Sequence, residues 1–150
     1  MNQRARIAMS DDDVTAFLEA AHKLQLATIN GDGTPHLVTM FYGLSEGRIA
    51  FWTYAKSQKA RNLARDPRLT CLVETGDAYD ELRGVLVYGK AGRLDDRDRV
   101  MDVGMMVARR TTPGVPDELL RPYVEKTGLK RVAYVVERTK VVSWDHRRLA

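Results

Sequence analysis

Residues 51–67, FWTYAKSQKARNLARDP, carry the clearest structural signal in this chain. The segment begins as an apolar strand, breaks at Ser57-Gln58-Lys59, and continues as a short helix that Pro67 ends. Lys56 and Lys59 lie at the start of this helix, where the helix dipole disfavours positive charge. A bound anion reverses that preference, because the free N–H groups of the first turn and the lysines then point at the same negative group.

The predicted helix offers Ser57 as its cap and carries Arg61 one turn in. Ala60, Leu63 and Ala64 recur at the i, i+3, i+4 spacing of a face that packs on a sheet. A solvated helix whose lysines extend into water explains the same pattern equally well. The physical chemistry of this segment therefore leaves both interpretations open.

Outward from this segment, alternating apolar residues and turn signals predict an antiparallel meander. The strands are expected at 24–30, 35–43, 48–53, 69–74, 82–91 and 131–144. Further helices are expected at 13–22, 95–110 and 117–126. The pattern predicts a mainly β domain over 1–150, a closed or nearly closed six-stranded antiparallel barrel with peripheral helices.

The composition is that of an ordinary soluble domain, with 44% hydrophobic and 29% charged residues. We expect neither a membrane span, which needs about 20 apolar residues, nor a signal peptide. A single cysteine, Cys71, and the absence of Cys/His spacing favour a cytoplasmic protein without a metal. The net charge of +4 favours an anionic partner. Nucleic acid ranks last, since basic and acidic residues are interleaved and no lysine-rich tail occurs.

The order strand, turn, Ser-x-Lys-Ala, helix, Asp-Pro resembles the pyridoxamine 5′-phosphate oxidase-like split-barrel family. The resemblance rests on Thr53, Ser57, Lys59, Ala60, Asn62, Leu63, Asp66 and Pro67. It extends to LATINGDGTPHLVTMFY before this motif and to LVYGKAGRL after it, and covers residues 24–94 closely. It implies an FMN-binding-type split barrel that forms a homodimer with a flavin or deazaflavin at the subunit interface.

The same resemblance implies the cofactor-binding residues. Ser57 and Lys59 would bind the cofactor phosphate, with Lys56 or Arg61 assisting. Trp52 and Thr53 would lie along the edge of the cofactor. The ring would lie, largely through backbone groups, along His36, Leu37, Val38, Thr39 and Met40. Arg109 or Arg110 of a partner subunit would add positive charge.

Two departures argue against pyridoxamine phosphate oxidation itself. Val38 stands where those enzymes carry an arginine, and the C-terminus SWDHRRLA lacks their substrate-binding His and Arg pair. The chain is more similar to the actinobacterial branch that uses coenzyme F420, a deazaflavin with a phosphate and a polyglutamate tail. The expected activity is hydride transfer from reduced F420 to an unsaturated organic substrate. The alternatives are an FMN-binding oxidoreductase and a non-catalytic binder of flavin, haem or tetrapyrrole. The sequence identifies no catalytic residue.

Overall fold

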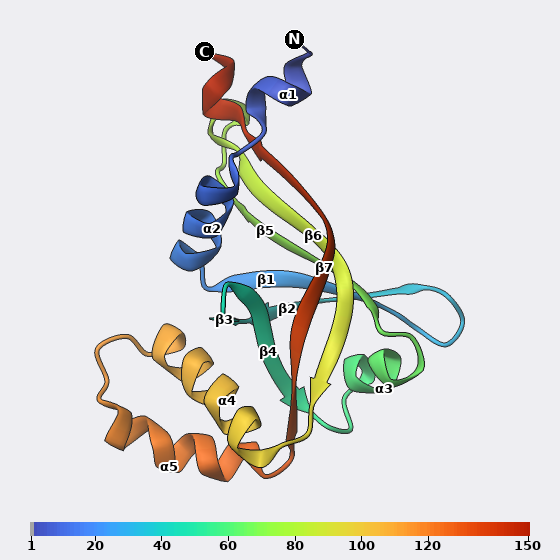
Figure 1. Cartoon of the computed structure of the whole chain (residues 1–150), viewed down its shortest axis with the longest axis vertical. Coiled ribbons are helices and arrows are strands. Elements are labelled where there is room, and N and C mark those ends of the chain that lie inside the picture. The colour runs from blue at the N-terminus through green and yellow to red at the C-terminus, as the bar shows by residue number, and fades with distance from the viewer. Residues whose placement is uncertain (1) are drawn as a thin grey trace.

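A computed structural model describes residues 2–150 as one curled antiparallel sheet with helices packed on it (Figure 1). The strands are β1 (Lys23–Ile29), β2 (Pro35–Phe41), β3 (Gly43–Ser45), β4 (Arg48–Tyr54), β5 (Arg68–Thr75), β6 (Arg83–Leu94) and β7 (Arg131–Asp145). The helices are α1 (Gln3–Ile7), α2 (Asp11–Ala20), α3 (Gln58–Arg65), α4 (Arg97–Thr111) and α5 (Asp117–Gly128). Two 3₁₀ turns complete the described chain, η1 (Tyr79–Glu81) and η2 (His146–Leu149).

Tyr42 connects the two edge strands of the sheet. Its strand order is β2-β1-β5-β6-β7-β4-β3, so β2 and β3 occupy opposite edges although only Tyr42 separates them in the chain. The sequence predicts a single strand over 35–43; instead the backbone turns at Tyr42 and divides it. The Tyr42 ring is fully buried, and its hydroxyl donates a hydrogen bond to the Leu18 carbonyl at 2.5 Å. The expected split barrel is confirmed, with seven strands in place of six.

Alternate residues of the strands fill the inside of the curl. Leu26, Cys71, Val87 and Tyr134 belong to this inner core, and α2 and α3 add further apolar side chains to it. In α3 the predicted face is partly wrong. Ala60 and Leu63 are buried, but Ala64 is exposed, and the amide of Asn62 lies inside instead.

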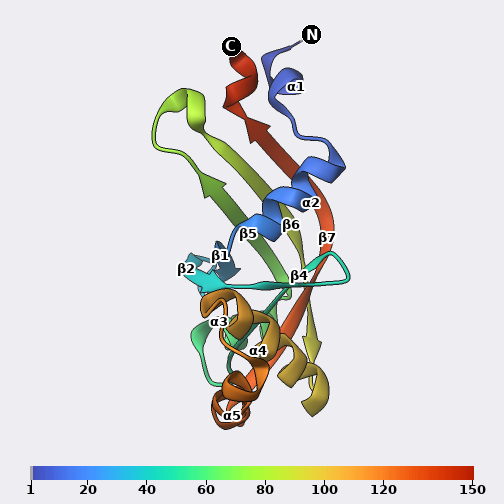
Figure 2. The same cartoon turned by 90° about the vertical axis from the view of Figure 1, so that its left-hand side faces the viewer.

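The α4–α5 hairpin covers the outer face of the sheet at the lower end of β4 and β7 (Figures 1 and 2). Trp52 is the centre of this contact. A Cβ atom at Gly104 would lie 2.6 Å from the Trp52 ring, and one at Gly128 would lie 3.3 Å from it. Glycine at both positions therefore allows the two helices to approach the indole.

The outer face of β2 and β6 remains open. Leu37 is 65% exposed on this face, Phe41 46% and Tyr88 41%. Both termini lie at the far end of β6 and β7 from the hairpin (Figures 1 and 2). Within residues 2–150 no helix is both long and apolar enough to cross a membrane.

Candidate functional site

The turn between β4 and α3 is built around Ser57. Its hydroxyl accepts a hydrogen bond from the Ala60 N–H at 3.2 Å, so Ser57 caps the helix as predicted. The buried Thr53 hydroxyl lies 3.3 Å from the same oxygen, which joins the end of β4 to the cap. The first turn of α3 contains no acidic residue. Its positive dipole end is thus left for an external anion.

Asn62 fixes the position of this helix end. Its side-chain amide donates hydrogen bonds to the Thr28 hydroxyl and the Asn30 side-chain carbonyl, each at 3.0 Å. Its own carbonyl accepts one from Gln58 at 2.9 Å. A buried amide with all these partners holds α3 against β1 and sets the direction in which the helix N-terminus points.

Lys59 is half-buried in the first turn of α3. Burial lowers the pKa of its ammonium below the ordinary value, and the nearby positive charge of Arg131 lowers it further. Across residues 2–150 neither cation forms an ion pair with a carboxylate. Two neighbouring cations without a carboxylate partner repel each other, and an anion bound between them would relieve that repulsion.

Arg131 begins β7 directly beside the helix end. The Ala55 N–H donates a hydrogen bond to the Lys130 carbonyl at 2.9 Å, and Tyr54 and Arg131 face each other across the β4–β7 pair. The guanidinium lies over the rings of Trp52 and Tyr54. Its Nε is buried and has no hydrogen-bond partner within the described chain. An unpartnered buried donor in a fixed guanidinium is a binding feature, because leaving it unpaired is unfavourable.

A cavity of about 420 Å³ extends from Arg131 between β2, β4 and the α4–α5 hairpin. Its walls are mostly apolar or aromatic, with Arg131 and two threonines as polar groups; the lining residues are Thr39, Met40, Phe41, Trp52, Val107, Ala108, Thr111, Tyr123 and Arg131. An apolar cleft with a few fixed polar groups at one end is typical of a site for a flat organic ligand with an anionic group.

Of the residues expected in the site, Thr39, Met40 and Trp52 line this cavity, and Thr53, Ser57 and Lys59 form the adjacent helix end. Others lie apart. Lys56 and Arg61 are exposed, and Arg61 bonds to Gln58. His36 and Val38 are half-buried on the inner side of β2, whereas Leu37 points outward.

The sequence interpretation missed Arg131 and the hairpin residues of the cavity. Arg131 is an ordinary charged residue at a strand start, and it follows Lys59 by 72 residues in the chain. Only the β4–β7 pairing places it beside α3. Arg109 and Arg110, expected to act from a partner subunit, both have contacts within their own subunit. Arg109 pairs with Asp117 at 2.7 Å, and Arg110 donates to the Leu18 and Ala21 carbonyls at the end of α2.

Comparison with known proteins agrees with the fold. The profile of the family described as "Pyridoxamine 5′-phosphate oxidase" matches residues 10–134. The conserved hypothetical protein Rv2991 from Mycobacterium tuberculosis is 42% identical, with a TM-score of 0.92 over 99% of this chain and 92% of that one. No curated protein matches the chain.

Two further solved structures share the fold at lower identity. One is described as an F420 reductase; it is 24% identical, with a TM-score of 0.64 over 84% of this chain and 93% of its own. The other is an FAD-binding protein from Mesorhizobium loti, 18% identical, with a TM-score of 0.69 over 91% and 94% of the two chains.

Proposed function

Because the chain belongs to the pyridoxamine 5′-phosphate oxidase family, we propose that it is an oxidoreductase that uses the deazaflavin coenzyme F420. The family includes oxidoreductases, and flavin-type cofactors occur among proteins of this fold. The choice of F420 among them is our own inference. It rests on the charge of the site and on the sequence features of residues 51–67.

The observation that carries the proposal is the pair of uncompensated cations at the N-terminus of α3. Lys59 is half-buried with a lowered pKa, and the buried Nε of Arg131 has no partner among residues 2–150. A phosphate group accepts hydrogen bonds from both cations and from the free N–H groups of the helix end. The adjoining apolar cavity of about 420 Å³ has room for a flat ring system. The residues present therefore fit a phosphorylated flavin-type cofactor.

In this proposal Ser57, Thr53, Lys59 and Arg131 hold the phosphate. Trp52 and the β2 segment from His36 to Met40 border the ring, the latter largely through backbone groups. Lys56 and Arg61, both exposed, are free to reach an acidic tail that extends into solvent. F420 carries such a tail, and FMN does not.

When bound, reduced F420 supplies a hydride to an electrophilic carbon of an unsaturated organic substrate. The protein's own part is orientation and exclusion of water. Arg131 is stacked on two aromatic rings, and the hairpin residues Val107 and Ala108 make part of the cavity wall apolar. We assign no catalytic acid to the chain.

We also propose that the protein is a cytoplasmic homodimer. The open outer face carries Leu37, Phe41 and Tyr88, all large and exposed, beside the half-buried Leu72 and Leu86. Several large exposed apolar side chains on one face of a sheet favour a protein–protein contact there. Phe41 belongs both to this face and to the cavity wall, so a second copy packed on β2 would complete the cofactor site.

FMN is the principal alternative cofactor, because its phosphate suits the same cations. The test is a side-by-side fluorescence titration of the purified protein with F420 and with FMN. Tighter binding of F420, followed by substrate-dependent oxidation of the reduced cofactor, supports the proposal. Tighter binding of FMN assigns the protein to the flavin users, and cofactor binding without turnover of any unsaturated substrate indicates a carrier.

A further inference from the structure

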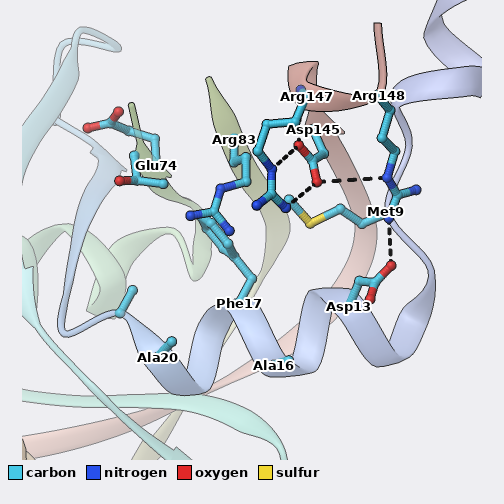
Figure 3. A pocket seen from close by; sticks show the side chains of 12 residues that line it. Met9, Asp13, Ala16, Phe17, Ala20, Glu74, Arg83, Asp145, Arg147 and Arg148 are labelled. Atoms are coloured by element: carbon cyan, nitrogen blue, oxygen red, sulfur yellow. Dashed lines mark hydrogen bonds and ion pairs between the residues drawn. The ribbon is translucent and has the colours of Figure 1, made fainter. Parts of the chain in front are cut away.

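A second cavity, of about 400 Å³, lies at the end of the sheet where the two termini meet (Figures 1 and 3). It is enclosed by α2, by the ends of β5 and β6 that adjoin η1, and by the C-terminal turn. It shares no residue with the cavity beside Trp52. Its volume lies within the range of small-molecule pockets, about 300–1,000 Å³.

One wall of this cavity is apolar, and it is formed by Ala16, Phe17 and Ala20 of α2. Ala16 and Ala20, one turn apart, present only methyl groups to the space, and Phe17 closes it beneath β6 (Figure 3). Met9 adds a flexible apolar side chain. Short residues on this face leave a volume that larger ones would fill.

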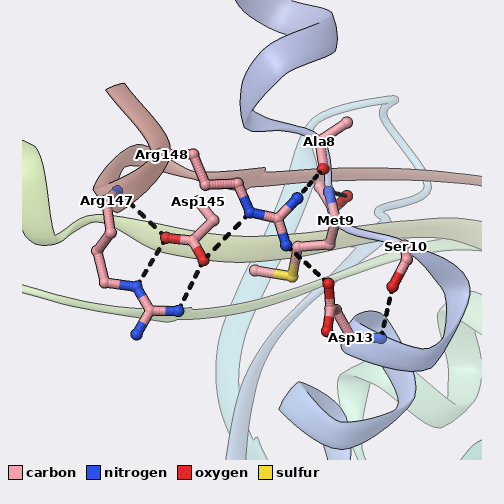
Figure 4. Close-up of polar contacts among 8 residues, drawn as sticks. Ala8, Met9, Ser10, Asp13, Asp145, Arg147 and Arg148 are labelled. Atoms are coloured by element: carbon pink, nitrogen blue, oxygen red, sulfur yellow. Dashed lines mark hydrogen bonds and ion pairs between the residues drawn. The ribbon is translucent and has the colours of Figure 1, made fainter. Parts of the chain in front are cut away.

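The opposite wall is ionic, and most of its charges are already paired (Figure 4). Asp145 accepts hydrogen bonds from Arg147 at 2.8 and 2.7 Å, and Asp13 accepts one from Arg148 at 2.7 Å. Arg148 also donates to the Ala8 carbonyl at 2.6 Å. Hydrogen bonds from these arginines lower the pKa of both carboxyl groups, so the two carboxylates stay ionised and compensate Arg147 and Arg148.

Arg83 is the exception. Asp145 is its direct neighbour across the β6–β7 pair, but that carboxylate is turned to Arg147. The Arg83 guanidinium is half-buried over the Phe17 ring, 5.5 Å from the ring centre, with no carboxylate within ion-pair distance in the described chain. A half-buried cation without a carboxylate partner, placed beside an apolar wall, favours a ligand that has both a negative group and an apolar body.

Glu74 limits the charge of that ligand. Its exposed carboxylate lies on the rim of the same cavity, without an ion-pair partner in residues 2–150. It would repel a phosphate or a dicarboxylate more strongly than a single carboxylate. We propose that this cavity binds a monocarboxylate, with the carboxylate on Arg83 and an apolar body against Ala16, Ala20 and Phe17. The inference is independent of the proposed function, because it uses none of the residues near α3.

The test is calorimetric titration of the full-length protein with 4-phenylbutyrate and with the neutral analogue 4-phenylbutanol. The carboxylate should bind at least about tenfold more tightly than the alcohol, the ratio expected for one charge-assisted hydrogen bond. Arg83→Gln should remove this preference. Arg93→Gln, which loses an arginine paired with Asp95 outside the cavity, should leave it unchanged.

Ala16→Leu fills the cavity without changing its charge and should weaken both ligands at least about tenfold. Thermal unfolding shows whether Ala16→Leu is folded. If it is not, the comparison of wild type with Arg83→Gln tests the proposal by itself. No saturable binding of 4-phenylbutyrate, or equal binding by wild type and Arg83→Gln, overturns the proposal. The affinity for F420 should be the same in wild type and Arg83→Gln. This measurement separates a failure of the monocarboxylate proposal from a failure of the proposed cofactor site at α3.

Discussion

The guanidinium of Arg131 lies 4.6 Å from the centre of the Trp52 ring, and Trp52 is in turn packed against Gly104 of α4. One indole thus contacts both the hairpin on the outside of the barrel and the cation beside the proposed anion site. Stacking on Trp52 and Tyr54 holds this arginine in place, and no carboxylate is needed to do so. Its charge remains available to a ligand.

Arg131→Gln is expected to weaken F420 binding by about 1.5–3 kcal/mol, the range for a hydrogen bond to a charged group. The loss should be similar for FMN if both cofactors place their phosphate here. The measurement is a fluorescence titration. Arg121→Gln, which removes an exposed arginine of α5, is the matched control and should bind like wild type. Unchanged affinity in Arg131→Gln would show that Arg131 does not contact the cofactor.

Lys59 is expected to lower the stability of the cofactor-free protein at neutral pH. Since its pKa is lowered on folding, the unfolded chain binds more protons between that lowered value and 10.5. The free energy of unfolding attributable to Lys59 therefore rises with pH through this window. Lys59→Met should remove this slope and raise stability near pH 7, by no more than about 1 kcal/mol because the amine is partly solvated. Urea unfolding between pH 7 and 10, with Lys126→Met as control, measures both effects; a destabilised Lys59→Met would contradict this account.

Gly104→Ala is expected to destabilise the α4–α5 hairpin. The added Cβ would lie 2.6 Å from the Trp52 ring and 2.8 Å from Val124, so the helix must move away from β4. Overpacking of this kind costs about 1–3 kcal/mol, which outweighs the gain of about 1 kcal/mol in helix propensity. Thermal unfolding tests this, with Gly92→Ala, whose nearest contact is 3.4 Å, as the comparison. Equal stability of the two variants would mean that the hairpin is not in close contact with Trp52.

Leu37→Lys is expected to dissociate the proposed homodimer, because it buries a charge in the apolar face of β2. Leu37 is 65% exposed in the single chain, and Leu119 on α5 is 69% exposed. Leu119→Lys is therefore a matched control that should leave the dimer intact. Sedimentation velocity distinguishes the two species. A wild-type protein that sediments as a monomer would refute the homodimer directly.

The strands were predictable because their apolar residues alternate and their turns contain glycine and asparagine. The division at Tyr42 was not, since no local signal marks the point where one extended segment changes its hydrogen-bonding partner. That change depends on closure of the sheet, which pairs β2 with β1 and β3 with β4. The five-residue helix α1 was also missed, because a helix this short depends on tertiary contacts.

The helix end at Ser57 was predictable from local sequence, because capping and dipole rules act within one turn. Asn62 required the fold, since its hydrogen bonds reach Thr28 and Asn30, more than thirty residues away. Arg131 could be assigned to the candidate site only from the fold, because the pairing of Tyr54 with Arg131 is what brings this arginine beside α3. Local rules thus indicate the α3 half of the proposed anion site, and only the folded barrel adds Arg131 to it.

The most direct test of the anion site is a fluorescence titration of wild type and Lys59→Ala with F420, with Lys126→Ala as control. The account predicts affinity for F420 that falls by about 1.5–3 kcal/mol in Lys59→Ala and is unchanged in Lys126→Ala. Circular dichroism should show that both variants are folded. Equal affinity of wild type and Lys59→Ala would mean that the cofactor phosphate does not bind at the N-terminus of α3, and the central claim would fail.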